Sequence, residues 1–262
     1  MFFGKNFLIY NYRFFSSKLE VCLTKKSYVL FMNLNSKSGT RYMYKDGDYF
    51  IVEDETKHYF VKSRGVHYKN SLKKRVLDLI ISYNIDKINF YKNDLIIDVG
   101  ANTGDLIPFF PNQRYIGFEP SPEEFKVLSK NSNSKNDLYN YAVGDAEKWT
   151  DFWISSLGAD SSLYQPLRFE SIIKVKQIRL DKLINERVKL LKVDAEGAEV
   201  EVINGCKNLL SKIEFIAIDL GFEKGIKQES TAPPVFEILY KHKFKSVHVG
   251  KNERYLFKNQ TR

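Results

Sequence analysis

A short glycine-rich segment bounded by aspartates is suited to hold a small ligand. It reads Asp98-Val-Gly-Ala-Asn-Thr-Gly-Asp105 and follows the apolar run Leu95–Ile97. Gly100 permits a tight turn that brings the backbone close to a ligand, and Asn102 tolerates a positive φ nearly as well as glycine does. Gly104 lets the following segment pack closely. The segment is therefore predicted to be a ligand-binding loop at the end of a buried strand.

The spacing and charge of this loop narrow the class of ligand. Dinucleotide folds surround a pyrophosphate with Gly-x-Gly-x-x-Gly, whereas this sequence has the tighter Gly-x-Asn-x-Gly. The carboxylates disfavour a pyrophosphate and favour a cation, and S-adenosylmethionine (SAM) carries a sulfonium and an ammonium group. No Gly-Lys-Ser/Thr phosphate loop occurs in the chain. The predicted cofactor contacts in the loop are Asp98, Gly100, Ala101, Asn102 and Gly104.

Two later strand ends are predicted to complete the cofactor site. Glu119 ends the expected strand Tyr115–Glu119, 19 positions after Gly100. An acidic group at this place can bind both hydroxyls of a ribose. Ala142 lies near the end of the expected strand Leu138–Val143, where a contact with adenine, mainly through the backbone, is expected.

Acidic residues also follow the fourth and fifth expected strands. The segment Lys192-Val-Asp-Ala-Glu-Gly-Ala-Glu199 leaves the fourth strand, and Asp219 ends the fifth. Asp194 or Glu196 could take a proton from an acceptor hydroxyl and act as a catalytic group. Asp194 and Asp219 could also hold a hard divalent cation such as Mg²⁺ through oxygen ligands. Glu199 is expected to interact with a helix N-terminus instead.

The elements that position these residues alternate between strand and helix from residue 91 to residue 262. The expected strands are 95–99, 115–119, 138–143, 189–194, 215–219, 245–249 and 255–257, and the expected helices include 122–131 and 234–241. This alternation predicts an α/β domain with a mostly parallel sheet that ends in a hairpin. The paired serines of the loop Gly158–Leu163, Ser161 and Ser162, could hydrogen-bond a polar substrate, but composition alone favours a plain surface turn.

Residues 1–90 are predicted to form a small β-rich appendage that ends in a helix. Two runs, Arg41–Tyr44 and Tyr49–Val52, flank an Asp-Gly pair that is typical of a hairpin turn. His58–Val61 is expected to add a strand. Apolar residues then recur at helical spacing over Ser71–Tyr83.

The composition of the chain indicates which partners it favours and whether it could bind a metal through cysteines or span a membrane. The 262 residues have 43% hydrophobic residues, two cysteines and a formal net charge of +9. A basic chain favours anionic partners such as nucleic acid or an acidic membrane surface. Cys22 and Cys206 form no metal-binding spacing, and no apolar run reaches the roughly 18 residues of a membrane span. These features predict a cytoplasmic protein, and the aromatic, basic segment Met1–Phe15 adds the option of peripheral membrane contact.

Together these motifs resemble those of the FkbM family of SAM-dependent methyltransferases. The matching elements are Ile97–Gly104, Phe118–Ser121, Ser161–Leu163, Ile178–Leu183, Leu191–Glu199 and Ile218–Gly225. The resemblance implies a Rossmann-like class I methyltransferase domain, with a mostly parallel seven-stranded sheet and a C-terminal antiparallel hairpin. The short, proline-bounded segment Leu106–Pro111 departs from the pattern, because it leaves little room for a first helix.

The resemblance also implies an activity and a set of site residues. Members transfer a methyl group from SAM to a hydroxyl of a sugar, glycan, glycolipid or polyketide-type product. The implied SAM contacts are Asp98, Gly100, Asn102, Gly104 and Glu119, and the implied acidic pair is Asp194 and Glu196.

Two other classes of function remain as alternatives. The net charge of +9 motivates a nucleic-acid methyltransferase. Enzymes that methylate amino groups of DNA usually carry Asn/Asp-Pro-Pro-Tyr/Phe after strand four, whereas this chain has Asp194-Ala-Glu-Gly. Neither cysteine has the setting of a nucleophile for cytosine C5, so nucleic acid is disfavoured as a partner relative to a glycan or small molecule. The second alternative is a non-catalytic SAM-fold binding protein, and the intact loop at Asp98 argues against it.

Overall fold

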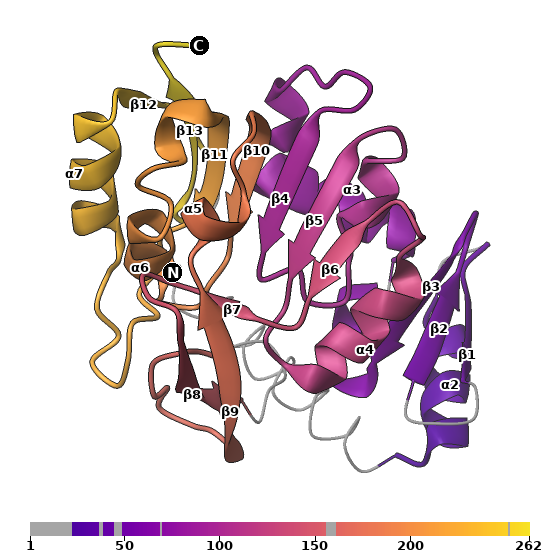
Figure 1. Cartoon of the computed structure of the whole chain (residues 1–262). Coiled ribbons are helices and arrows are strands. Elements are labelled where there is room, and N and C mark those ends of the chain that lie inside the picture. Colours follow the sequence, from indigo (N-terminus) through magenta and orange to yellow (C-terminus); the bar gives the residue numbers. More distant parts are fainter. Residues whose placement is uncertain (1–22, 37–38, 45–48, 69, 156–160, 251) are drawn as a thin grey trace, which may run out of the picture. The chain divides into compact units, whose positions relative to one another are not determined.

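The chain forms two compact units that divide inside a helix. The computed structural model describes residues 23–36, 39–44, 49–68, 70–155, 161–250 and 252–262. The two units are Met1–Arg75 and Val76–Arg262. The division falls within α3 (Leu72–Ser82), which Figure 1 labels, instead of near residue 90. The second half of α3 and Tyr83 therefore belong to the larger unit.

The smaller unit contains a helix and a three-stranded antiparallel sheet. Its elements are α2 (Lys25–Leu34), β1 (Arg41–Tyr44), β2 (Tyr49–Glu53), β3 (Lys57–Val61) and the 3₁₀ helix η1 (Lys62–Tyr68). The core is aromatic and includes the buried side chains of Tyr28, Tyr42, Phe50, Phe60 and Tyr68. The predicted strands are confirmed, whereas the Asp-Gly turn at residues 46–47 and the segment Met1–Phe15 lie outside the described residues.

The larger unit is built on a seven-stranded sheet. Across the sheet the strands are β12 (Phe244–Val249), β13 (Arg254–Asn259), β11 (Ile213–Asp219), β10 (Val188–Val193), β4 (Leu95–Val99), β5 (Arg114–Phe118) and β6 (Asp137–Tyr139). Strand β13 runs antiparallel to both β11 and β12, and the other neighbouring pairs of this sheet are parallel. The predicted class I fold with its closing hairpin is confirmed. The strand order reverses between β4 and β10, and ligands of such sheets bind beyond the carboxyl ends of the strands at this point.

The two faces of this sheet differ in chemistry. Successive side chains of a strand point to opposite faces. On one face, Ile97, Val99, Leu191 and Val193 pack in one apolar core with residues of α6 (Glu199–Asn204) and α7 (Ala232–Lys241). The alternate positions include Asp98 and Lys192, so the other face carries charge towards the carboxyl ends of β4 and β10.

One predicted strand is wrong. The run expected at 138–143 is divided, because β6 ends at Tyr139 and β7 (Ala142–Val143) pairs instead with β9 (Ser171–Ile178) in a separate sheet of order β7-β9-β8. Strand β8 spans Lys148–Ile154. The chain leaves the large sheet at Asn140, whose Nδ2 donates to the carbonyl oxygens of Glu119 and Pro120 at 2.8 and 3.0 Å.

The remaining helices are short. They are η2 (Ile85–Lys87), η3 (Ile107–Phe109), α4 (Pro122–Asn131), α5 (Leu180–Leu183) and η4 (Leu210–Lys212). Between β4 and β5 there is only η3, as the prolines of Leu106–Pro111 led us to expect. Within the described part of the chain, no helix is both long and apolar enough to cross a membrane.

Candidate active site

A buried lysine, Lys192, joins the predicted cofactor loop to β10. Lys192 on β10 stands in register with Asp98 on β4, and its Nζ lies 3.0 Å from Asp98 Oδ1. The same ammonium group donates to the carbonyl oxygen of Gly100 at 2.9 Å. Burial by itself lowers the pKa of Lys192, but the carboxylates of Asp98 and Asp194 outweigh it and hold that pKa above its usual value. Lys192 is therefore a cation at neutral pH.

A second ion pair forms on the neighbouring strands. Arg254 on β13 stands in register with Asp219 on β11, and its Nε donates to Asp219 Oδ2 at 2.7 Å. Its guanidinium also donates to Ser82 Oγ at 2.9 Å and lies 4.4 Å from the ring centroid of Tyr83. Asp219 is buried and held by this cation.

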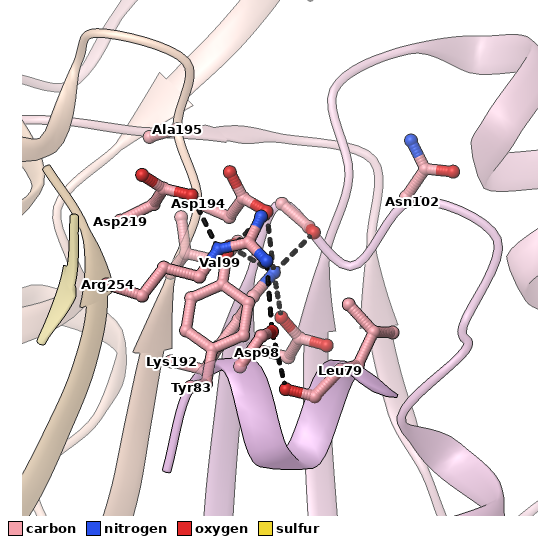
Figure 2. Close-up of polar contacts among 12 residues, drawn as sticks. Leu79, Tyr83, Asp98, Val99, Asn102, Lys192, Asp194, Ala195, Asp219 and Arg254 are labelled. Atoms are coloured by element: carbon pink, nitrogen blue, oxygen red, sulfur yellow. Dashed lines mark hydrogen bonds and ion pairs between the residues drawn. The ribbon is translucent and has the colours of Figure 1, made fainter. Parts of the chain in front are cut away.

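Asp194 lies between the two ion pairs. Its Oδ2 accepts a hydrogen bond from the Tyr83 hydroxyl at 2.7 Å and lies 3.8 Å from Lys192 Nζ. Figure 2 shows Tyr83, Lys192, Arg254 and the three aspartates gathered in one cluster, while Asn102 lies apart on the loop. The side chain of Asp194 is 25% exposed, compared with 2% for Asp98 and 7% for Asp219. It is therefore the most accessible of the three carboxylates.

The predicted ligand loop turns where its glycines require it. Gly100 and Asn102 have φ of +74° and +49°, as expected from their residue types. Gly104 has φ +83°, and a Cβ on it would lie 2.9 Å from the side chains of Ile107 and Leu128, which confirms the close packing expected there. A Cβ on Gly100 would lie 1.9 Å from the carbonyl oxygen of Asp194. The loop and the segment that carries Asp194 are thus in direct backbone contact at this position.

This contact predicts a severe effect for Gly100→Ala. The left-handed conformation costs a non-glycine residue roughly 1–2 kcal/mol, and the added carbon also collides with the Asp194 backbone. We expect Gly100→Ala to lower the free energy of unfolding by more than about 2 kcal/mol in urea titrations. The matched control is Gly225→Ala, because Gly225 has φ +67° and nothing within 4 Å of the added carbon. Equal losses in the two variants would contradict the proposed contact.

Glu119 holds the loop in place through the backbone. Its two carboxylate oxygens accept hydrogen bonds from the amides of Asn102 and Ser121, at 2.8 and 2.9 Å. The residue is buried, with 5% exposure. The predicted ribose carboxylate therefore lies beside the loop, and its contact with a ribose remains a prediction.

The other predicted cofactor contacts lie in different surroundings. Asp98 is 1% exposed, and its second oxygen accepts from the Tyr115 hydroxyl at 2.6 Å. Ala101 is buried, and its amide donates to the carbonyl of Phe118 at 2.9 Å. The Asp98 carboxylate thus lies in the protein interior at the start of the loop, in contact with Tyr115 and Lys192. Ala142 lies on β7, in the smaller sheet, so the position that directly follows β6 is Asn140 instead.

Glu196, the second predicted catalytic residue, lies in an unusual turn. It has φ +49°, and the next residue, Gly197, has φ +98°. The hydroxyl of Ser162 donates to the Glu196 carbonyl at 2.6 Å. Ser162 is therefore buried against the turn that follows β10, which corrects its interpretation as part of a plain surface turn. Residues 156–160 of that loop lie outside the described part of the chain.

The buried carboxylate of Glu199 bonds to the backbone of the same turn. Its Oε1 accepts hydrogen bonds from the amides of Ala195 and Gly197, at 3.0 and 3.1 Å. Its Oε2 is buried and has no hydrogen-bond partner among the described residues. Burial raises the pKa of Glu199 to about 7, although the backbone amides favour the charged form. Glu199 is thus the first residue of α6, and its carboxylate bonds to amides of the turn that precedes this helix.

The raised pKa of Glu199 predicts a pH-dependent stability. Its pKa is near 4.5 in the unfolded chain and about 7 in the folded chain. The stability contribution is therefore complete below about pH 4 and is lost as pH rises through 7, a loss of about 3 kcal/mol. We expect Glu199→Gln to remove this loss when urea unfolding is compared at pH 5 and pH 8. Glu237→Gln, at an exposed site on α7, is the control, and an unchanged pH dependence in Glu199→Gln would contradict the assignment.

The predicted divalent cation does not fit these donors. Asp219 is paired with Arg254, and Asp194 accepts from Tyr83 with Lys192 nearby. Two cationic side chains already stand where a metal would need open carboxylate oxygens. In the described ranges there is no group of three or more His, Cys, Asp or Glu side chains arranged to hold a metal.

Three residues of this cluster were missed from the sequence. Lys192 carried a usable signal, because a lysine in a buried strand is costly unless it is paired. Tyr83 was assigned only to a helix, and Arg254 was given no role. Tyr83 lies 111 positions from Asp194, and Arg254 lies 172 positions from its partner Ser82. No local pattern predicts contacts over such separations.

Comparisons with known proteins find similar sequences among methyltransferases. Residues 98–247 match the model of the methyltransferase FkbM domain. Hexuronic acid methyltransferase AglP of Haloferax volcanii is 26% identical over 137 residues, which cover 49% of this chain and 56% of the relative. The 2-O-methyltransferase NoeI of Sinorhizobium fredii is 26% identical over 182 residues, which cover 60% of this chain and 75% of the relative.

A solved structure is also similar. The FkbM methyltransferase from Methylobacillus flagellatus superimposes with a TM-score of 0.47 at 15% identity, covering 68% of this chain and 47% of that one. This chain thus spans only about half the length of the archaeal relative and of that structure.

Proposed function

The chain belongs to the FkbM methyltransferase family, and we propose that it transfers a methyl group from SAM to a hydroxyl of a sugar or glycan. The proposal has three parts: a general base, a cofactor site and a class of acceptor.

The distribution of charge around Asp194 carries the proposal. Two cations face three carboxylates, and the shorter ion pairs join Lys192 to Asp98 at 3.0 Å and Arg254 to Asp219 at 2.7 Å. Asp194 accepts from the neutral Tyr83 hydroxyl at 2.7 Å, lies 3.8 Å from Lys192 Nζ and has the most exposed side chain of the three, at 25%. A partly exposed carboxylate beside a cofactor loop is suited to accept the proton of an attacking hydroxyl. Asp194 is therefore the proposed general base, and Glu196, two residues later, is the second candidate.

The loop around Gly100 fits SAM by its shape and charge. Positive φ angles at Gly100, Asn102 and Gly104 turn the loop tightly, and the buried carboxylate of Glu119 accepts from the Asn102 amide. The residues that would hold SAM are Gly100, Asn102, Gly104 and Glu119. When bound, SAM supplies a methyl group on a positively charged sulfur that departs as a neutral thioether. The protein then has to align the acceptor and remove one proton, and alignment supplies much of the acceleration in such reactions.

The acceptor class rests on the relatives. The archaeal relative is named for hexuronic acid, and the rhizobial one for 2-O-methylation. Both names support a hydroxyl-bearing or carboxyl-bearing sugar as the acceptor. A base at the position of Asp194 suits a hydroxyl, since an alcohol is a weak nucleophile until its proton is removed.

The test combines cofactor binding with an acceptor panel. Calorimetry is expected to show binding of SAM and S-adenosylhomocysteine to the purified chain. Transfer of a labelled methyl group is then measured on neutral hexosides, hexuronic acids and RNA, with and without EDTA. We expect transfer to a sugar that EDTA does not change, because the donors do not fit a divalent cation. Failure to bind either cofactor form would reject the proposal, and transfer to RNA alone would favour a nucleic-acid methyltransferase.

A further inference from the structure

We propose that Tyr83 is a positioning residue that fixes the carboxylate of Asp194 for catalysis, and that Arg254 holds Tyr83 in place. The inference rests on the proposed function. It concerns residues outside the range 98–247 that matches the family model, because Tyr83 precedes that range and Arg254 follows it.

The Tyr83 hydroxyl is committed as a donor. Burial and the charge of Asp194 raise the pKa of Tyr83 well above its usual value, so the phenol keeps its proton. Its oxygen lies 2.7 Å from Asp194 Oδ2, which is the length of a strong hydrogen bond to a charged acceptor. Because the Tyr83 hydroxyl keeps its proton and donates it to Asp194 Oδ2, this hydrogen bond sets one orientation of the Asp194 carboxylate.

The ring of Tyr83 is itself fixed from several sides. It is fully buried. The guanidinium of Arg254 lies 4.4 Å from the ring centroid, and the Lys192 ammonium lies 5.6 Å from it. Both distances are within the range of cation–π attraction. Tyr83 therefore has little freedom to move away from Asp194.

Arg254 ties this ring to two strands and a helix. Its guanidinium donates to Asp219 on β11 and to Ser82 at the end of α3. The turn between β12 and β13 also packs closely on this helix end, since a Cβ on Gly250 would lie 2.2 Å from the Ser82 carbonyl oxygen. Arg254 and Gly250 of the C-terminal hairpin thus both contact the end of α3. Tyr83 follows this helix end, and its hydroxyl points toward Asp194 (Figure 2).

The assignment separates positioning from cofactor binding. Tyr83 contacts Asp194, whereas the comparable buried phenol of Tyr115 donates to Asp98, behind the ligand loop. Loss of the Tyr83 hydroxyl should therefore affect turnover, and loss of the Tyr115 hydroxyl should affect the loop. The two tyrosines form a matched pair, because each is fully buried and each donates to one aspartate.

The kinetic test uses Tyr83→Phe, which removes one oxygen and keeps the ring under Arg254. We expect kcat to fall about tenfold, with KM for SAM and for the acceptor unchanged within about twofold. Tyr240→Phe, at an exposed site on α7, should leave both constants unchanged. A Tyr83→Phe enzyme with wild-type kcat, or with its defect confined to KM, would overturn the assignment.

A spectroscopic test decides the question without turnover. Buried tyrosine hydroxyls that donate to carboxylates are expected to give slowly exchanging, downfield proton resonances. Tyr83→Phe should delete one such resonance and Tyr115→Phe another. Asp194→Asn should shift the Tyr83 resonance alone. A Tyr83 resonance that does not respond to Asp194→Asn would reject the positioning role even if no acceptor were found, whereas absence of SAM binding would reject only the proposed function.

Discussion

Replacing Asp194 with asparagine is expected to lower kcat for methyl transfer by about 10²- to 10⁴-fold, the usual contribution of a general base. The reason is accessibility, because the side chain of Asp194 is 25% exposed whereas those of Asp98 and Asp219 are 2% and 7% exposed. Asparagine keeps the shape and can still accept from the Tyr83 hydroxyl, but it cannot take a proton. The affinity for S-adenosylhomocysteine in calorimetry should remain close to that of the wild type.

Two companion variants sharpen this prediction. Asp151→Asn alters an exposed aspartate on β8 that is paired with Lys174, and it should leave kcat unchanged. Glu196→Gln tests the second candidate base and should cost less than Asp194→Asn, because Asp194 has the fixed hydrogen bond from Tyr83. If Glu196→Gln removed activity while Asp194→Asn kept it, Glu196 would be the base.

Lys192→Met is expected to lower the free energy of unfolding by about 3–5 kcal/mol at pH 7, because breaking a buried ion pair leaves an uncompensated charge. The Lys192 side chain is 6% exposed, and it faces two carboxylates and the Gly100 carbonyl. Methionine fills a similar volume without the cation. Urea titration of the variant and the wild type measures the difference.

The controls for Lys192 separate burial from the loss of any lysine. Lys174→Met breaks an ion pair whose members are 66% and 45% exposed, and the unfolding free energy should change by less than about 1 kcal/mol. The double variant Lys192→Met/Asp98→Asn should recover part of the loss, since one buried carboxylate charge is then removed as well. A loss below about 1 kcal/mol in Lys192→Met would show that the pair contributes little to stability.

Local sequence patterns were sufficient to predict most of the strands, helices and turns. The residue types predicted the tight turn at Gly100, the positive φ at Asn102 and the close packing at Gly104. The prolines near Leu106–Pro111 predicted that no full helix follows β4. These features depend on residues that are close in the sequence, and steric rules for one residue at a time decide them.

The division at Asn140 shows where local patterns end. The residues from Leu138 to Val143 look like one strand, yet β6 and β7 pair in different sheets. The bend is stabilised by the Asn140 side chain, which bonds to the backbone after β5. A pattern of apolar residues cannot indicate which neighbour a strand will pair with, because pairing depends on segments far away in the chain.

The sequence by itself determined the class of fold, the ligand loop and the acidic residues at the strand ends, because these follow from residue type and short spacing. The tertiary structure alone decided which of the three carboxylates is most exposed. Strand register sets Lys192 beside Asp98 and Arg254 beside Asp219. Helix α3 then places Tyr83, 111 positions away in the chain, against Asp194. The hydrogen bond and ion pair of Asp194 come from these distant partners, since electrostatic and hydrogen-bond energies depend on distance in space rather than along the chain.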